Sequence, residues 1–164
     1  ENAPSMLKAF GCTYSLVGHS ERRTLHAETD DVVAAKYEAI QKGGLIPVLC
    51  IGETLAQFEA GTTNQVVETQ LKAVIDRCGI ASFENAVIAY EPVWAIGTGV
   101  VAEPHQVQAM HAMIRSVLSN LGISGDETPI LYGGSVKPEK AKELYNKLHA
   151  VIREFKENER NNKK

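Results

Sequence analysis

The sequence predicts an α/β domain built on a parallel β-sheet, and two observations lead to this fold class. First, four short apolar runs, partly β-branched, have the character of buried β-strands, at residues 14–17, 46–51, 87–90 and 130–132. Second, a stretch with helical spacing separates each run from the next. Strands that are joined by helices run parallel and use right-handed crossovers, so the four runs are expected to form one parallel sheet.

Three helices are predicted between these strands. The first spans residues 31–41, because Thr29 is suited to cap a helix start and Gly43 to end a helix. The second spans residues 64–77, and the third runs from residue 104 to about 119 and opens with a proline. The second helix has its apolar residues on one face, namely Val67, Leu71, Val74 and Ile75.

A further helix is predicted to start at Pro138, and no strand is predicted after residue 132. Its apolar stripe consists of Leu144, Leu148, Val151, Ile152 and Phe155 and ends in a polar segment. A stripe of this kind either packs on the sheet or pairs with a partner helix.

Composition narrows the class of protein. The chain has 164 residues, of which 44% are hydrophobic, so it is expected to be one globular domain with a real core. A net charge of −3 argues against a nucleic-acid surface, and we find neither an apolar run that could span a bilayer nor a secretory signal. The cysteines, Cys12, Cys50 and Cys78, are odd in number and lack metal-ligand spacing. We therefore expect a reducing, cytoplasmic location and no membrane association.

Glu91 follows the third predicted strand, where Pro92 turns the chain away from the sheet. Bulky residues follow, and then Gly97, Thr98 and Gly99, a pattern typical of an apolar flap on a flexible hinge. Ligand sites of parallel sheets lie at the carboxyl ends of strands, so Glu91 is a candidate catalytic carboxylate. The alternative is a solvated glutamate beside an ordinary connection.

Polar or glycine-rich residues also follow the other strands. His19 comes after the first strand and starts a possible short helix, whose dipole disfavours a protonated ring and leaves a neutral hydrogen-bond donor. Ser135 ends a Gly-Gly-Ser turn after the fourth strand, which suits phosphate binding by backbone N–H groups. The alternatives are a structural histidine and a plain turn.

Four segments, "GCTYSLVGHSERR", "GLIPVLCIGET", "VIAYEPVWAIGTG" and "LYGGSVKP", resemble the triosephosphate isomerase family in their order and spacing. The resemblance covers residues 1–144 and implies the fourth to seventh βα units of a TIM (β/α)8 barrel, here an incomplete half-barrel. Residues 145–164 resemble no part of the family and are expected to form a separate helical tail.

The resemblance also implies residue roles. Glu91 matches the base that interconverts dihydroxyacetone phosphate and glyceraldehyde 3-phosphate, in glycolysis and gluconeogenesis, and His19 matches the electrophile that polarises the carbonyl. Residues 92–99 match the lid. The Gly97 backbone N–H and Ser135, which lies in the loop after the seventh strand of the family barrel, match contacts to the substrate phosphate. Neither a cofactor nor a metal is implied.

The sequence also departs from the family. Three βα units, including a strand that carries an Asn and a Lys of the site, have no match, and neither does the eighth strand. Four strands do not close a barrel, so we expect activity only when self-association or a complementing chain supplies the rest. The alternatives are a catalytically silent half-barrel that serves as an interaction module, and a half-barrel that retains only phosphate binding through Gly97 and Ser135.

Overall fold

A parallel four-stranded sheet forms the centre of the computed structural model, which describes residues 3–123 and 128–147. The strands are β1 (Tyr14–Val17), β2 (Ile46–Ile51), β3 (Val87–Tyr90) and β4 (Ile130–Tyr132). Their order in the sheet is their order in the chain, and each neighbouring pair is parallel. The predicted strand positions and direction are confirmed.

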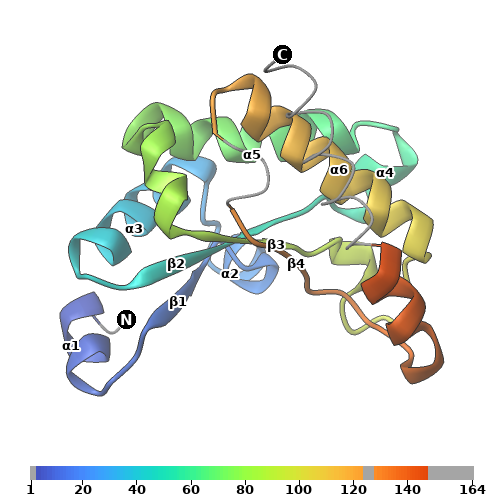
Figure 1. Cartoon of the computed structure of the whole chain (residues 1–164), viewed down its shortest axis with the longest axis horizontal. Helices are drawn as coiled ribbons and strands as arrows, with labels where there is room; N and C mark the ends of the chain where they lie inside the picture. The colour runs from blue at the N-terminus through green and yellow to red at the C-terminus, as the bar shows by residue number, and fades with distance from the viewer. Residues whose placement is uncertain (1–2, 124–127, 148–164) are drawn as a thin grey trace, which may run out of the picture.

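Three long helices cover one face of the sheet, as Figure 1 shows. They are α3 (Asp30–Lys42), α5 (Thr63–Cys78) and α6 (Pro104–Asn120), and each lies within one residue of its predicted limits. The Thr29 hydroxyl caps α3 by accepting a hydrogen bond from the Val32 N–H. The predicted apolar face of α5 is confirmed, because Val67, Leu71 and Val74 are fully buried.

Several short elements complete the described part of the chain. They are α1 (Pro4–Ala9), α2 (Ser20–Leu25), α4 (Leu55–Glu59), η1 (Ile80–Asn85) and η2 (Val93–Ala95). Residues 138–147 are helical, which confirms a helix start at Pro138. Leu148, Val151, Ile152 and Phe155 of the predicted stripe lie outside the described residues. Within the described ranges, no helix combines the length and the apolar character needed to cross a bilayer.

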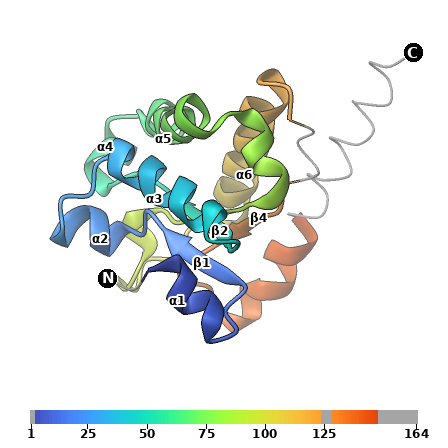
Figure 2. The same cartoon turned by 90° about the vertical axis from the view of Figure 1, so that its left-hand side faces the viewer.

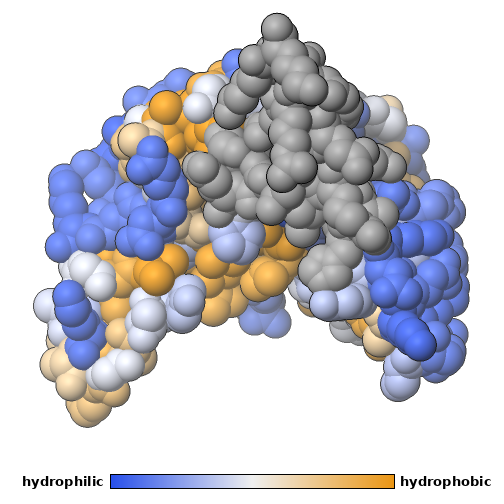
Figure 3. Space-filling model, viewed as in Figure 1, coloured by the Kyte–Doolittle hydropathy of each residue, from blue (hydrophilic) through white to orange (hydrophobic). Residues whose placement is uncertain are grey.

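The two faces of the sheet differ in exposure. Strand residues alternate between faces, so Leu49 and Ile51 point to the helices and are buried. On the opposite face, Tyr14, Leu16 and Leu131 are 56%, 62% and 52% exposed. Figure 3 shows apolar atoms in the hollow beneath the arch that the molecule forms in this view. The face that would line the interior of a barrel is therefore open.

Both edges of the sheet are open as well. Figure 2 shows β1 at one edge, between α1 and α3, and β4 forms the other edge. Among the described residues, β1 pairs only with β2, and β4 pairs only with β3. The sheet is thus part of a barrel and is not closed, as expected for an incomplete half-barrel.

Candidate active site

The predicted site residues follow the carboxyl ends of the four strands, so they lie at the same end of the sheet. Glycines on both sides make room for Glu91, which directly follows β3. A Cβ at Gly52 would overlap the Glu91 carbonyl group, and a Cβ at Gly133 would lie 2.7 Å from the Glu91 Cγ. The backbone is fixed in place, because the Glu91 N–H donates to the Ile51 carbonyl at 2.8 Å. The neighbouring strands therefore hold Glu91 closely.

Glu91 is a largely buried carboxylate, with 9% of the residue exposed. Burial raises its pKa above the ordinary value, while the neighbouring His19 and the Cys50 thiol oppose this effect. A raised pKa brings a carboxylate closer to the range in which it both accepts and returns a proton near neutral pH. The environment of Glu91 suits a general base.

His19 lies opposite Glu91 and caps the start of α2. Its Nδ1 accepts a hydrogen bond from the Glu21 N–H at 3.3 Å, so a neutral ring carries its proton on Nε2. That Nε2 lies 3.6 Å from Glu91 Oε2. The helix start thus turns the donor nitrogen of His19 toward the candidate base.

The segment after Glu91 is anchored at its base by a buried carboxylate. The Trp94 indole donates to Glu53 at 2.9 Å, and the Tyr90 hydroxyl donates to both Glu53 oxygens at 3.2 Å. Glu53 has no exposed surface. The Trp94 ring also packs on Phe58, with the ring centroids 4.7 Å apart. Trp94, near the start of the predicted lid, is therefore held by Glu53, which follows β2, and by Phe58 of α4.

Gly97 and Ser135 lie in different surroundings. Ser135 is half-buried, and its N–H donates to the Ala95 carbonyl at 3.0 Å, which joins the turn after β4 to the predicted lid. Gly97 is exposed, has a φ of 66°, and has nothing within 4 Å of where a Cβ would lie. The structure thus brings His19 and Glu91 together and places Ser135 beside the predicted lid, whereas Gly97 is exposed and has open space around it.

The described residues contain no cluster of three or more His, Cys, Asp or Glu side chains that could hold a metal ion. The site consists instead of a carboxylate, an imidazole and backbone N–H groups. This arrangement is suited to proton transfer beside an anionic group.

Comparison with known proteins shows the family to which the chain belongs. The sequence model of the family described as Triosephosphate isomerase matches residues 1–151. The chain belongs to the triosephosphate isomerase family. It is 59% identical over 146 residues to the triosephosphate isomerase of Dechloromonas aromatica, which covers 88% of this chain and 59% of that protein. The triosephosphate isomerase of Psychromonas ingrahamii is 62% identical over 146 residues, again 88% of this chain and 58% of the relative.

The chain spans about three fifths of the length of these triosephosphate isomerases. This coverage agrees with an open sheet of four strands where the family fold has eight. The identification as a partial member of the isomerase family is therefore confirmed.

Glu53 has a place in the site that was not predicted from the sequence. Its position two residues after the end of β2 was visible in the sequence, but its partners Tyr90 and Trp94 lie 37 and 41 positions further along the chain. The usable signal is the sole tryptophan of the sequence, whose indole N–H needs an acceptor when the ring is packed.

Proposed function

We propose that this chain contributes the proton-transfer half of a triosephosphate isomerase site, for the interconversion of dihydroxyacetone phosphate and glyceraldehyde 3-phosphate. The observation that carries the proposal is the 3.6 Å approach of His19 Nε2 to Glu91 Oε2 at the carboxyl ends of β1 and β3, the two parallel strands on either side of β2. The carboxylate removes a proton from the substrate carbon beside the carbonyl. His19 donates a hydrogen bond from Nε2 to the carbonyl oxygen, where negative charge develops.

The resulting enediolate receives the proton from Glu91 on the adjacent carbon, and the hydroxyl proton passes from the oxygen of the first carbon to the oxygen of the former carbonyl, so the carboxylate is regenerated and no atom is gained or lost. We propose that residues 92–99 close over this intermediate, because an open site would let water protonate it or phosphate leave. In the closed lid, the Gly97 N–H and the turn at Ser135 are proposed to bind the substrate phosphate. The hydrogen bond between Ser135 and Ala95 supports a coupling of these two segments.

The isolated chain is proposed to be inactive. The reaction needs positive charge beside the developing oxyanion, and the sequence offers no match for the family strand that carries a lysine. The open edges at β1 and β4 support a partner that completes the barrel, either a complementing chain or a second copy. We assign residues 1–144 to the barrel and residues 145–164 to a separate tail, and we propose a cytoplasmic location.

The test is an isomerase assay with dihydroxyacetone phosphate, on the purified chain alone and after addition of a separately made segment with the missing βα units. We expect no activity above background for the chain alone and measurable activity for the mixture. In the mixture, Glu91→Gln should lower the rate by at least about 100-fold, because the general base is lost. Glu84→Gln, the same change on an exposed glutamate of η1, should leave the rate unchanged.

Two results would contradict this proposal. Full activity of the monomeric chain would show that the missing strands are not needed. An active mixture with an unaffected Glu91→Gln variant would remove Glu91 from the mechanism. An inactive mixture in which both components are folded and bound would favour the second candidate, a catalytically silent half-barrel, which the exposed apolar face of the sheet supports.

A further inference from the structure

A small cavity lies beside Glu91, between the start of α2 and the end of β2. Its volume is about 10 Å³, at the lower limit of what one water molecule requires. Arg23 and Ser20 line it from α2, Cys50 and Gly52 line it from the β2 side, and Glu91 lines it from the end of β3. The cavity is therefore lined both by the candidate base and by the partly buried side chain of Arg23.

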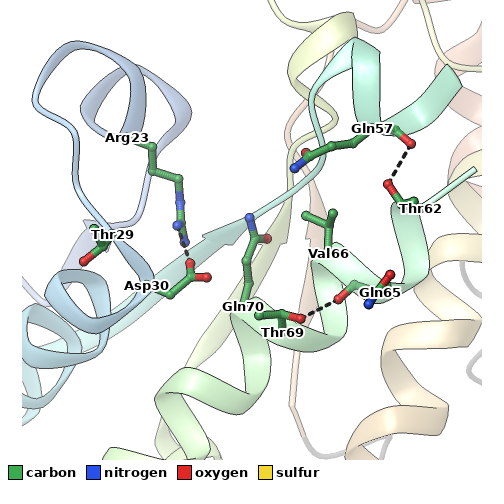
Figure 4. Close-up of a pocket in the computed structure, with 9 residues that line it drawn as sticks. All are labelled: Arg23, Thr29, Asp30, Gln57, Thr62, Gln65, Val66, Thr69 and Gln70. Carbon is green, nitrogen blue, oxygen red and sulfur yellow. Dashed lines mark hydrogen bonds and ion pairs between the residues drawn. The ribbon is translucent and has the colours of Figure 1, made fainter. Parts of the chain in front are cut away.

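Arg23 is fixed through two of its three nitrogens. Nε donates to the Gly18 carbonyl at 2.8 Å, and Nη1 donates to Asp30 at 2.6 Å. Figure 4 shows Arg23 extending toward Asp30 on the wall of a polar pocket. The third nitrogen, Nη2, is enclosed and has no hydrogen-bond partner in the described part of the chain. A buried N–H without an acceptor is costly, so Nη2 calls for an acceptor that the protein atoms do not provide.

Glu91, in contrast, has an enclosed acceptor oxygen that lacks a hydrogen-bond donor. Its Oε2 is also enclosed and accepts no hydrogen bond from the described residues, because His19 Nε2 at 3.6 Å is too distant to donate one. The backbone of Gly52, another part of the cavity wall, is satisfied at both of its polar groups by the Gln70 amide. A donor without an acceptor and an acceptor without a donor thus belong to residues that share one water-sized cavity.

We propose that one ordered water in this cavity accepts a hydrogen bond from Arg23 Nη2 and donates one to the Glu91 carboxylate, and that Arg23 is thereby a positioning residue for Glu91. Buried waters make about three hydrogen bonds, and the Ser20 hydroxyl on the cavity wall can complete the set. The water fixes the carboxylate, and the guanidinium charge favours its ionised form. The competing explanation is that Arg23 only braces α2 against α3 through Asp30.

The first test is the titration of Glu91, followed by carbon NMR of its carboxyl group. A His19→Gln background removes the imidazole that faces Glu91. The other groups that face Glu91 are the Cys50 thiol, whose pKa burial raises to about 12, and Arg23 with its partner Asp30. In this background, Arg23→Met should raise the measured pKa of Glu91 by about one pH unit, because the charge and the water contact are both lost.

The matched control is Asp30→Asn, which removes the charged brace and retains Nη2. We expect it to leave the Glu91 pKa unchanged or slightly lower. An equal rise in both variants would show that Arg23 is only a brace, and no change in Arg23→Met would also overturn the proposal.

The second test needs no variant that has to fold. A high-resolution crystal structure of the unaltered chain should show a water within hydrogen-bond distance of both Arg23 Nη2 and Glu91. A cavity without a water, or a direct contact between the two side chains, would overturn the proposal.

As a statement about catalysis, the inference rests on the base role proposed for Glu91. The titration and the water do not depend on that role. A Glu91 pKa that responds to Arg23 in a protein that never isomerises substrate would contradict the proposed function alone. An active assembly in which Arg23→Met leaves the Glu91 pKa unchanged would contradict the positioning role alone.

Discussion

At the scale of single residues, His111 is a buried ionisable group outside the candidate site. Only 2% of the residue is exposed, and its ring packs edge-on against Tyr90 in the core between α6 and β3. Burial, together with the nearby charge of Arg115, lowers the pKa of His111 to about 4. The unfolded chain binds this proton near pH 6.5, so folding and protonation of His111 oppose each other.

We therefore predict that the free energy of unfolding falls as the pH falls from 6.5 toward 4. The unfolded state binds more protons than the folded state in this window, so acid favours unfolding. From pH 7.5 to 5, His111 should account for about 2 kcal/mol of the loss. Urea unfolding at both pH values measures it, and His111→Gln should remove this part of the pH dependence.

His105→Gln is the control for this prediction, because His105 is exposed at the start of the same helix. The control should keep the pH dependence of the unaltered chain. Equal slopes in the His111→Gln variant and the unaltered chain would show that His111 is accessible to protons in the folded state.

At the scale of elements, the segment 92–99 is tied down at one end and free at the other. Trp94 is held by Glu53 and Phe58, whereas Gly97 and Gly99 are exposed and both have positive φ values, 66° and 75°. A segment with one fixed end and a glycine-rich free end is suited to move as a lid about its anchored base.

We predict that Glu53→Gln loosens the anchored start of the segment 92–99. The two oxygens of Glu53 serve the donors of Tyr90 and Trp94, and a glutamine would present an NH2 group to at least one of them. The variant should lose about 1–3 kcal/mol of stability, the cost of a buried unsatisfied group. Because Trp94 is the sole tryptophan, acrylamide quenching of its fluorescence should increase.

Glu59→Gln makes the same chemical change at the exposed end of α4 and should alter neither stability nor quenching. Unchanged quenching in Glu53→Gln would mean that packing on Phe58 alone holds Trp94.

The sequence was most informative for the strands and the three long helices. The strands match their predicted limits because apolar runs buried against helices stop where polar or glycine residues begin, as at Gly18 and Gly52. Helix α4 was not predicted, because five residues are too short to show a periodic pattern, and Thr54 and Gln57 hold its start by a capping box. The small cavity that Arg23 and Glu91 both line could not be predicted, since it lies between separate elements of the fold.

At the scale of the whole molecule, the sheet has exposed apolar side chains on its inner face and, in the part of the chain that the structure describes, two unpaired edges. Such a surface favours association. We predict that the purified chain self-associates and that Leu16→Ser combined with Leu131→Ser shifts it toward monomer. Sedimentation velocity measures the change, and circular dichroism confirms that the fold is retained.

The control is Leu25→Ser, on an apolar residue of α2 that is 74% exposed but does not belong to the sheet. Its association should equal that of the unaltered chain. A monomeric unaltered chain at high concentration would show that the inner face is not an association surface.

The order of the strands also bears on how the chain folds. Within residues 3–123 and 128–147, each strand pairs only with the strand before or after it in the sequence, and no pair joins the first strand to the last. The sheet can therefore be assembled one βα unit at a time, each step closing only the short chain segment of a single crossover, at a modest entropic cost. During synthesis, β1 and β2 can therefore pair before β4 has been made.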